Sequence, residues 1–184
     1  MRRVFAAGYA LGMAAIAVVL MSTSVNAWQC DFVTGGGFIY VNGAKGTFAI
    51  GGGCKHNEYW GHLEYQDHGT GLNAHWTSIT AYQEWDSNND GKGRLIGQRL
   101  ICGTARTNQF GDVNFAVLVR DNGEPGTDDE FDIQLKKPDG TLAYTTGPGY
   151  PHKLGGGTNG GGNIQLHKPN ASNTGVFGGS CPAL

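Results

Sequence analysis

Residues 113–119 read VNFAVLV and residues 131–135 read FDIQL, and these two stretches decide the fold. In both, apolar side chains occupy every second position. Because consecutive side chains of a strand point to opposite faces, this alternation predicts two strands that each bury one face. No segment after residue 27 has the period of an amphipathic helix over three turns. The chain is therefore predicted to be all-β.

Further segments have strand-like composition and are separated by turn-forming residues. Asn42-Gly43 is a strong two-residue hairpin signal, and residues 137–140 (KPDG) form a turn by their chemistry. Short strands at regular spacing predict one antiparallel β-sandwich domain, jelly-roll-like and of about nine strands, over residues 28–184. The predicted strands are 38–41, 47–50, 60–67, 72–81, 95–107, 113–119, 131–135, 142–145 and 163–167.

The first 27 residues have the three parts of a secretory signal peptide. Arg2 and Arg3 precede an apolar stretch over residues 4–21, and Val25-Asn26-Ala27 forms a cleavage motif. The alternative is an uncleaved membrane anchor, since the stretch is almost long enough to span a bilayer. Cleavage after Ala27 predicts a protein that is secreted, or retained in a periplasm, with no membrane attachment.

The charge of the chain argues against two classes of partner. The predicted leader contains two arginines and no acid, so its removal takes the formal net charge from −2 to about −4. The chain has no run of Lys or Arg, so it lacks the basic surface that binds nucleic acid or anionic lipid. The expected partner is an extracellular ligand, either a protein or a polysaccharide.

The four cysteines form an even set in a chain predicted to be exported, and this favours two disulfides. Three pairings are possible. We favour Cys30–Cys181, which would join the ends of the domain, together with Cys54–Cys102. A zinc site built from all four thiolates is the alternative, although no CxxC pair is present.

Four segments together resemble the bacterial post-COAP-1 domain family. They are residues 33–37 (VTGGG), 62–73 (HLEYQDHGTGLN), 121–131 (DNGEPGTDDEF) and 161–168 (GGNIQLHK). The likeness covers nearly all of the chain after the leader, in order. It implies an extracytoplasmic β-rich domain and implies no reaction.

Residues 86–91 (DSNNDG) match the start of a calcium-binding loop. Asp86, Asn88 and Asp90 supply oxygen at positions one, three and five, and Gly91 supplies the sharp turn. Position twelve is Gly97, where a bidentate Glu belongs. The alternative is a solvated hairpin tip, because Asp, Asn and Gly also dominate such tips.

A second calcium site is predicted in the connection between the two alternating strands. Acidic residues are so dense there that their mutual repulsion disfavours folding unless a cation or the solvent screens it. Asp121, Asp128 and Asp129 are the candidate ligands. An exposed loop screened by water and salt is the alternative. The whole acidic set is Asp121, Glu124, Asp128, Asp129, Glu130 and Asp132.

A histidine cluster is predicted on the hairpin of strands 60–67 and 72–81. With its turn at residues 68–71, Glu64 pairs with His75, and His62 lies on the same face. Two imidazoles and a carboxylate suit zinc or copper, and they also suit acid–base catalysis. The alternative is a polar outer face of the sheet.

An aromatic platform for sugar stacking is a further hypothesis, with Tyr59, Trp60, Tyr82 and Trp85 as candidates. Packing in the core or at its rim is the alternative. The sequence lacks a GxSxG elbow, an HExxH motif and a P-loop. The interpretation we favour is a non-catalytic secreted binding or structural module, stabilised by calcium. The other hypotheses are a small metal-dependent enzyme using His62, Glu64 and His75, and a carbohydrate-binding module.

Overall fold

The computed structural model describes residues 30–147 and 152–184, so the predicted signal peptide at residues 1–27 lies outside the described residues. The described chain forms strands and one short 3-10 helix. The elements are β1 (Phe32–Val41), β2 (Ala44–Lys55), β3 (Glu58–Asp67), β4 (Leu72–Asn89), β5 (Leu95–Thr107), β6 (Gly111–Asp121), β7 (Glu130–Lys136), β8 (Leu142–Thr145), β9 (His152–Lys153), η1 (Leu154–Gly156), β10 (Gly162–His167) and β11 (Gly178–Gly179).

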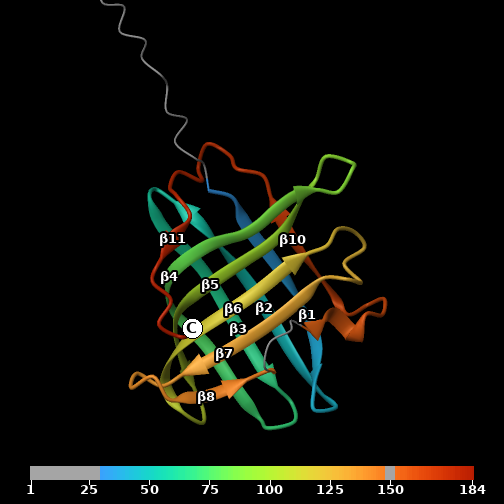
Figure 1. Cartoon of the computed structure of the whole chain (residues 1–184). Helices are drawn as coiled ribbons and strands as arrows, with labels where there is room; N and C mark the ends of the chain where they lie inside the picture. The colour runs from blue at the N-terminus through green and yellow to red at the C-terminus, as the bar shows by residue number, and fades with distance from the viewer. Residues whose placement is uncertain (1–29, 148–151) are drawn as a thin grey trace, which may run out of the picture.

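All the strands belong to one antiparallel sheet with the order β10-β1-β2-β3-β4-β5-β6-β7-β8, and β9 and β11 add to β7 and β4. In Figure 1 the sheet folds over on itself, so that β4 to β8 face β10 and β1 to β3. This confirms the predicted antiparallel β-sandwich. From β1 to β8 the strand order follows the chain order, as in a meander, and only β10 returns to pair with β1, so the order differs from the paired Greek keys of a jelly roll.

The core lies between the two layers and is built from alternate residues of each strand. The predicted inward row of Val113, Phe115, Val117 and Val119 is buried. On β7, Phe131 stacks on a ring from the opposite layer, since its centroid lies 3.9 Å from that of Phe48 on β2. Such contacts join the layers and remove apolar area from water, which is the main force that holds a sandwich together.

The C-terminal arm, residues 168–184, covers part of the outer face of the sheet. Its β11 pairs with Tyr82 and Ala81 of β4. Ala183 is buried in a small outer cluster that includes Leu100. Figure 1 shows the arm descending beside β4 to the C-terminus.

The two disulfides are confirmed, but the pairing that we favoured is wrong. The bonds are Cys30–Cys54 and Cys102–Cys181, with Cα–Cα distances of 5.7 and 5.2 Å. The reason is that Cys54 faces the inner core, whereas Cys102 faces the outer cluster under the arm. Side chains on opposite faces of a sheet cannot bond to each other.

Close backbone approach explains one of the glycine clusters. Gly37 of β1 pairs with Gly162 of β10. A Cβ atom on Gly37 would lie 2.3 Å from the carbonyl oxygen of Gly161. Any larger residue would therefore push β10 away from β1.

Candidate functional site

A buried arginine lies inside one end of the sandwich. On β5, Leu100 and Cys102 face the outer cluster, whereas Ile101 faces the inner core. Arg99 shares the inward parity of Ile101, and its side chain is fully buried. Asp31, immediately before β1, is also buried and pairs with it.

Every N–H group of the Arg99 guanidinium has an acceptor within the protein. Nε donates to Asp31 Oδ1 at 3.1 Å, and Nη1 donates to the carbonyl oxygens of Asp86 at 2.6 Å and Gln98 at 2.8 Å. Nη2 donates to Asp31 Oδ2 and, at 2.8 Å, to Ser87 Oγ. A guanidinium has five N–H donors, so none remains for a ligand.

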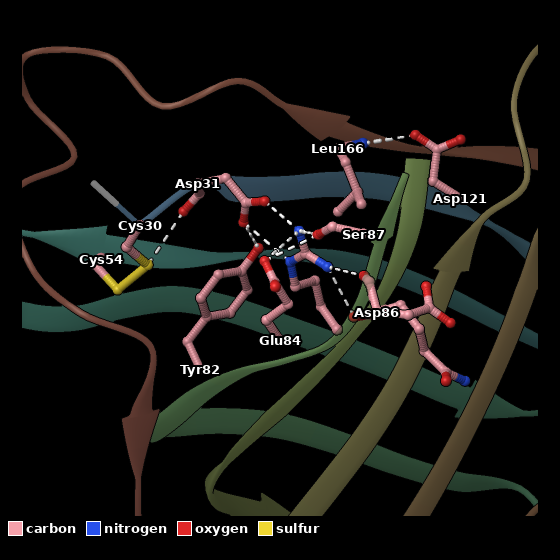
Figure 2. A network of polar contacts seen from close by, with 11 residues as sticks. Cys30, Asp31, Cys54, Tyr82, Glu84, Asp86, Ser87, Asp121 and Leu166 are labelled. Carbon is pink, nitrogen blue, oxygen red and sulfur yellow. Dashed lines mark hydrogen bonds and ion pairs between the residues drawn. A yellow bond between two sulfur atoms is a disulfide. The ribbon is translucent and has the colours of Figure 1, made fainter. Parts of the chain in front are cut away.

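The same network includes a tyrosine and a second acid (Figure 2). Tyr82 donates its hydroxyl to Asp31 Oδ1 at 2.7 Å, and Ser87 donates to Glu84 Oε2 at 2.9 Å. Figure 2 shows the side chains of Asp31, Tyr82, Glu84 and Ser87 converging on one point next to the Cys30–Cys54 disulfide.

Arg99 stays charged despite its burial. Loss of solvation alone would lower its pKa, but the hydrogen bonds and the ion pair with Asp31 outweigh this, and the net result is a raised pKa. Burial, and then the Asp31 charge, hold the pKa of Tyr82 well above its ordinary value. Tyr82 is therefore a neutral hydroxyl donor at physiological pH.

A pocket of about 550 Å³ opens beside this network. We call it the Arg99 pocket because it lies beside the Arg99 network, although Arg99 itself is fully buried and is not one of its lining residues. The Phe177 ring forms one wall, lying 5.3 Å from the guanidinium carbon of Arg99 and stacking on Tyr82 at 5.6 Å. Its volume falls within the range of small-molecule sites, about 300–1,000 Å³. The lining residues are Asp31, Glu84, Ser87, Leu95, Pro169, Val176 and Phe177.

The Arg99 pocket presents hydrogen-bond acceptors beside an apolar wall. Asp31 and Glu84 bring two carboxylates, and Arg99 neutralises one of them, so the net charge is negative. Glu84 is 41% exposed and can therefore meet a ligand. Leu95, Val176 and Phe177 supply the apolar surface. This combination repels anions and suits a ligand that carries hydrogen-bond donors and an apolar part.

The first predicted calcium loop begins within a strand. Asp86 and Asn88 belong to β4 and pair with Gln98 and Ile96 of β5, so the tight turn starts only at Asp90. Asp86 binds Arg120 at 2.8 Å. Asp90 Oδ1 accepts the backbone N–H groups of Lys92 and Arg94, which close the turn. The three predicted ligands are thus spread along an extended segment.

In the second predicted calcium site, two of the three aspartates point inward and hold β10 in place. Asp121 accepts the N–H groups of Gly123 and Leu166, both at 2.8 Å. Asp129 accepts those of Asn122 and Ile164, also at 2.8 Å. Burial raises the pKa of Asp121, and it raises that of Asp129 to about 6.

The third aspartate, Asp128, is exposed and forms an ion pair with Lys153 at 2.6 Å. Asp121 and Asp129 therefore serve as backbone acceptors inside the sandwich, while Asp128 lies on its surface. A calcium ion at either predicted site stays a prediction.

The predicted register of the histidine hairpin is confirmed. Glu64 of β3 pairs with His75 of β4, and the Glu64 carboxylate contacts His75 Nδ1. His62 lies two residues before Glu64, on the same face, and pairs with Gly51 of β2. No group of three or more His, Cys, Asp or Glu within residues 30–147 and 152–184 could hold a metal ion. The metal-dependent enzyme using these residues stays a prediction.

The four candidate aromatic residues separate into different surroundings. Tyr82 is buried in the Arg99 network, and Trp85 is exposed on β4. Tyr59 packs against the core. Trp60 lines a second, smaller pocket together with Phe32.

Sequence reasoning missed Arg99 and Asp31. A signal for Arg99 was present, because it occupies the inward parity of a strand whose other inward positions are small or apolar. A charge at such a position must be paired to be buried. Its partner lies 68 residues earlier in the chain, and strand alternation alone cannot identify it.

No helix among the described residues is long and apolar enough to cross a bilayer. No protein-family model matches the chain, and comparisons with curated proteins and with solved structures also find no match. The resemblance to the post-COAP-1 family therefore stays a prediction.

Proposed function

We propose that this protein is a non-catalytic binding module that acts outside the cytoplasm. In this proposal, the Arg99 pocket takes a lysine side chain of a protein or peptide partner. The predicted signal peptide supports export, and the two disulfides are compatible with an oxidising compartment.

The observation that carries the proposal is that the Arg99 pocket offers hydrogen-bond acceptors, whereas the donors nearest to it are already used within the protein. All the donors of Arg99 are used within the protein, whereas the pocket presents the exposed carboxylate of Glu84 beside the buried carboxylate of Asp31. A primary ammonium group has three donors and no acceptor, and therefore complements this set. The four-carbon stem of lysine suits the wall formed by Leu95, Val176 and Phe177.

The same geometry argues against other uses of this pocket. Phosphate and carboxylate ligands need free donors, and Arg99 offers none. A saccharide needs donors as well as acceptors, whereas the donors of Arg99 and Ser87 are already used within the protein.

The test is a calorimetric titration with three ligands of equal chain length: hexylammonium, hexanol and hexanoate. Hexylammonium should bind most tightly and hexanoate most weakly. Glu84→Gln should weaken hexylammonium binding about twofold to fivefold, since a partly exposed ion pair contributes about 0.2–1 kcal/mol. Glu64→Gln removes a similarly exposed acid elsewhere, 46% against 41% exposed, and should leave binding unchanged.

A second pair of variants tests the location. Val176 is 61% exposed on the pocket wall, and Leu142 is 52% exposed on β8. Val176→Lys places an ammonium group at the pocket and should abolish binding, whereas Leu142→Lys should not. Equal binding of hexylammonium and hexanoate, or equal effects of the two lysine variants, would refute the proposal.

A further inference from the structure

A second pocket, of about 300 Å³, lies beside the start of β1. Phe32 lines this pocket, whereas Asp31, the preceding residue, lines the Arg99 pocket. Val33 and Asp31 are buried on the inner side, so Phe32 points to the outer face. The two pockets are therefore separate sites. The second pocket is lined by Phe32, Lys55, Trp60, Asn170, Ser172 and Asn173.

Phe32 and Trp60, which line the second pocket, belong to an aromatic row that runs across four strands. Phe32 of β1 pairs with His167 of β10 on one side and with Gly53 of β2 on the other, and Gly53 pairs with Trp60 of β3. Directly paired residues share a face of the sheet. His167, Phe32 and Trp60 thus project from one line, and Gly53 adds no side chain between the last two.

The glycine lets these rings meet. Phe32 stacks on His167 with the centroids 4.3 Å apart, and its ring lies 6.2 Å from that of Trp60. Positions two strands apart are normally about 9–10 Å apart. Trp60 and Phe32 therefore form one joint aromatic surface of the kind on which an apolar ring face packs.

The rim of the second pocket is polar and comes mainly from the C-terminal arm. Asn170 Oδ1 accepts hydrogen bonds from the backbone N–H of Ser172 at 2.9 Å and from its hydroxyl at 2.6 Å. These bonds hold a tight turn against the pocket. Lys55 adds an exposed ammonium donor from the end of β2.

Two further polar atoms in the residues that line this pocket have no hydrogen-bond partner among the described residues. They are Trp60 Nε1, a donor, and Asn173 Oδ1, an acceptor. Asn173 is only 4% exposed, and its Nδ2 donates to the carbonyl oxygen of Cys54 at 3.2 Å. Buried polar atoms without partners are rare and call for an explanation. A hydroxyl group is both donor and acceptor and could satisfy either atom once a side-chain movement uncovers it.

We propose that this second pocket binds a pyranose ring of a neutral polysaccharide. The apolar face of the ring packs on Trp60 and Phe32. Its hydroxyl groups exchange hydrogen bonds with the amides, the serine hydroxyl and Lys55 at the rim. The assignment uses none of the residues that line the Arg99 pocket, so it stands or falls separately from the proposed function.

The experiment titrates the ¹⁵N-labelled protein with neutral hexasaccharides of glucose, mannose, galactose and N-acetylglucosamine. The indole N–H signal of Trp60, assigned by its loss in Trp60→Phe, should shift with at least one of them. Trp60→Ala should weaken that binding at least tenfold. Trp85→Ala removes an exposed tryptophan that is not part of the row and should change the affinity less than twofold.

Lys55→Met serves as a second variant, because Lys55 is exposed and its replacement should not affect folding. It removes one rim donor and should weaken binding about twofold to fivefold. Val176→Lys, which blocks the Arg99 pocket, should leave saccharide binding intact. The proposal is overturned if no hexasaccharide moves the Trp60 signal, or if Trp85→Ala weakens binding as much as Trp60→Ala.

Discussion

Replacing Arg99 by methionine should destabilise the protein severely. The variant leaves the Asp31 carboxylate buried without its counter-charge, and it removes the donors to the Asp86 and Gln98 carbonyl oxygens and to Ser87. Breaking a buried ion pair by removing one partner costs about 3–5 kcal/mol. That is a large part of the roughly 5–15 kcal/mol that stabilises an ordinary domain.

The assay is urea unfolding with the disulfides intact, followed by tryptophan fluorescence. Arg106→Met is the matched control, because Arg106 is on the same strand, is 73% exposed and forms a surface pair with Asp112 at 3.2 Å. Its cost should stay below about 1 kcal/mol. An Arg99→Met loss no larger than this would refute the reasoning.

Three other outcomes are expected. The pKa of Asp129 is raised to about 6, so the stability that wild type has over Asp129→Asn should fall by up to about 3 kcal/mol from pH 4 to pH 7 in denaturant titrations; a stability difference that stays constant over this range would contradict the expectation. Replacing Cys102 and Cys181 by alanine opens a longer loop than replacing the other pair, 79 against 24 residues of separation, and should cost roughly 4.5 rather than 3.5 kcal/mol; equal losses would contradict the chain-entropy account. If calcium binds, its addition at 100 times the dissociation constant should stabilise the fold by about 2.7 kcal/mol, and an unchanged melting temperature with calcium and with chelator would rule it out.

The strands could be predicted from the sequence because their signal is local. Alternation at 113–119 and 131–135 follows directly from one buried face, and the Asn42-Gly43 turn is observed between β1 and β2. The pairing of Glu64 with His75 followed from a single turn placement. Each of these inferences needs only neighbours in the chain.

The inward positions of two aspartates are predictable from the alternation of their strands. Asp121 continues the inward parity of Val113 to Val119, and Asp129 continues that of Phe131 to Leu135. Both therefore point into the sandwich, where they accept backbone N–H groups. Acid density alone suggested a metal, whereas parity distinguishes these two from the exposed Asp128.

The disulfide pairing and both pockets depend on the path of the C-terminal arm, and no local pattern encodes that path. Cys181 reaches Cys102 only because the arm crosses the outer face of β5. Pro169, Val176 and Phe177 complete one pocket, and Asn170, Ser172 and Asn173 complete the other.

The arm thus contributes residues to both pockets, and the Cys102–Cys181 disulfide attaches its far end to β5. While Cys102 and Cys181 remain thiols, as they would in a reducing cytoplasm, only noncovalent contacts hold the arm in place. If the protein is exported as proposed, oxidation outside the cytoplasm would fix the arm, and both pockets would be complete only there.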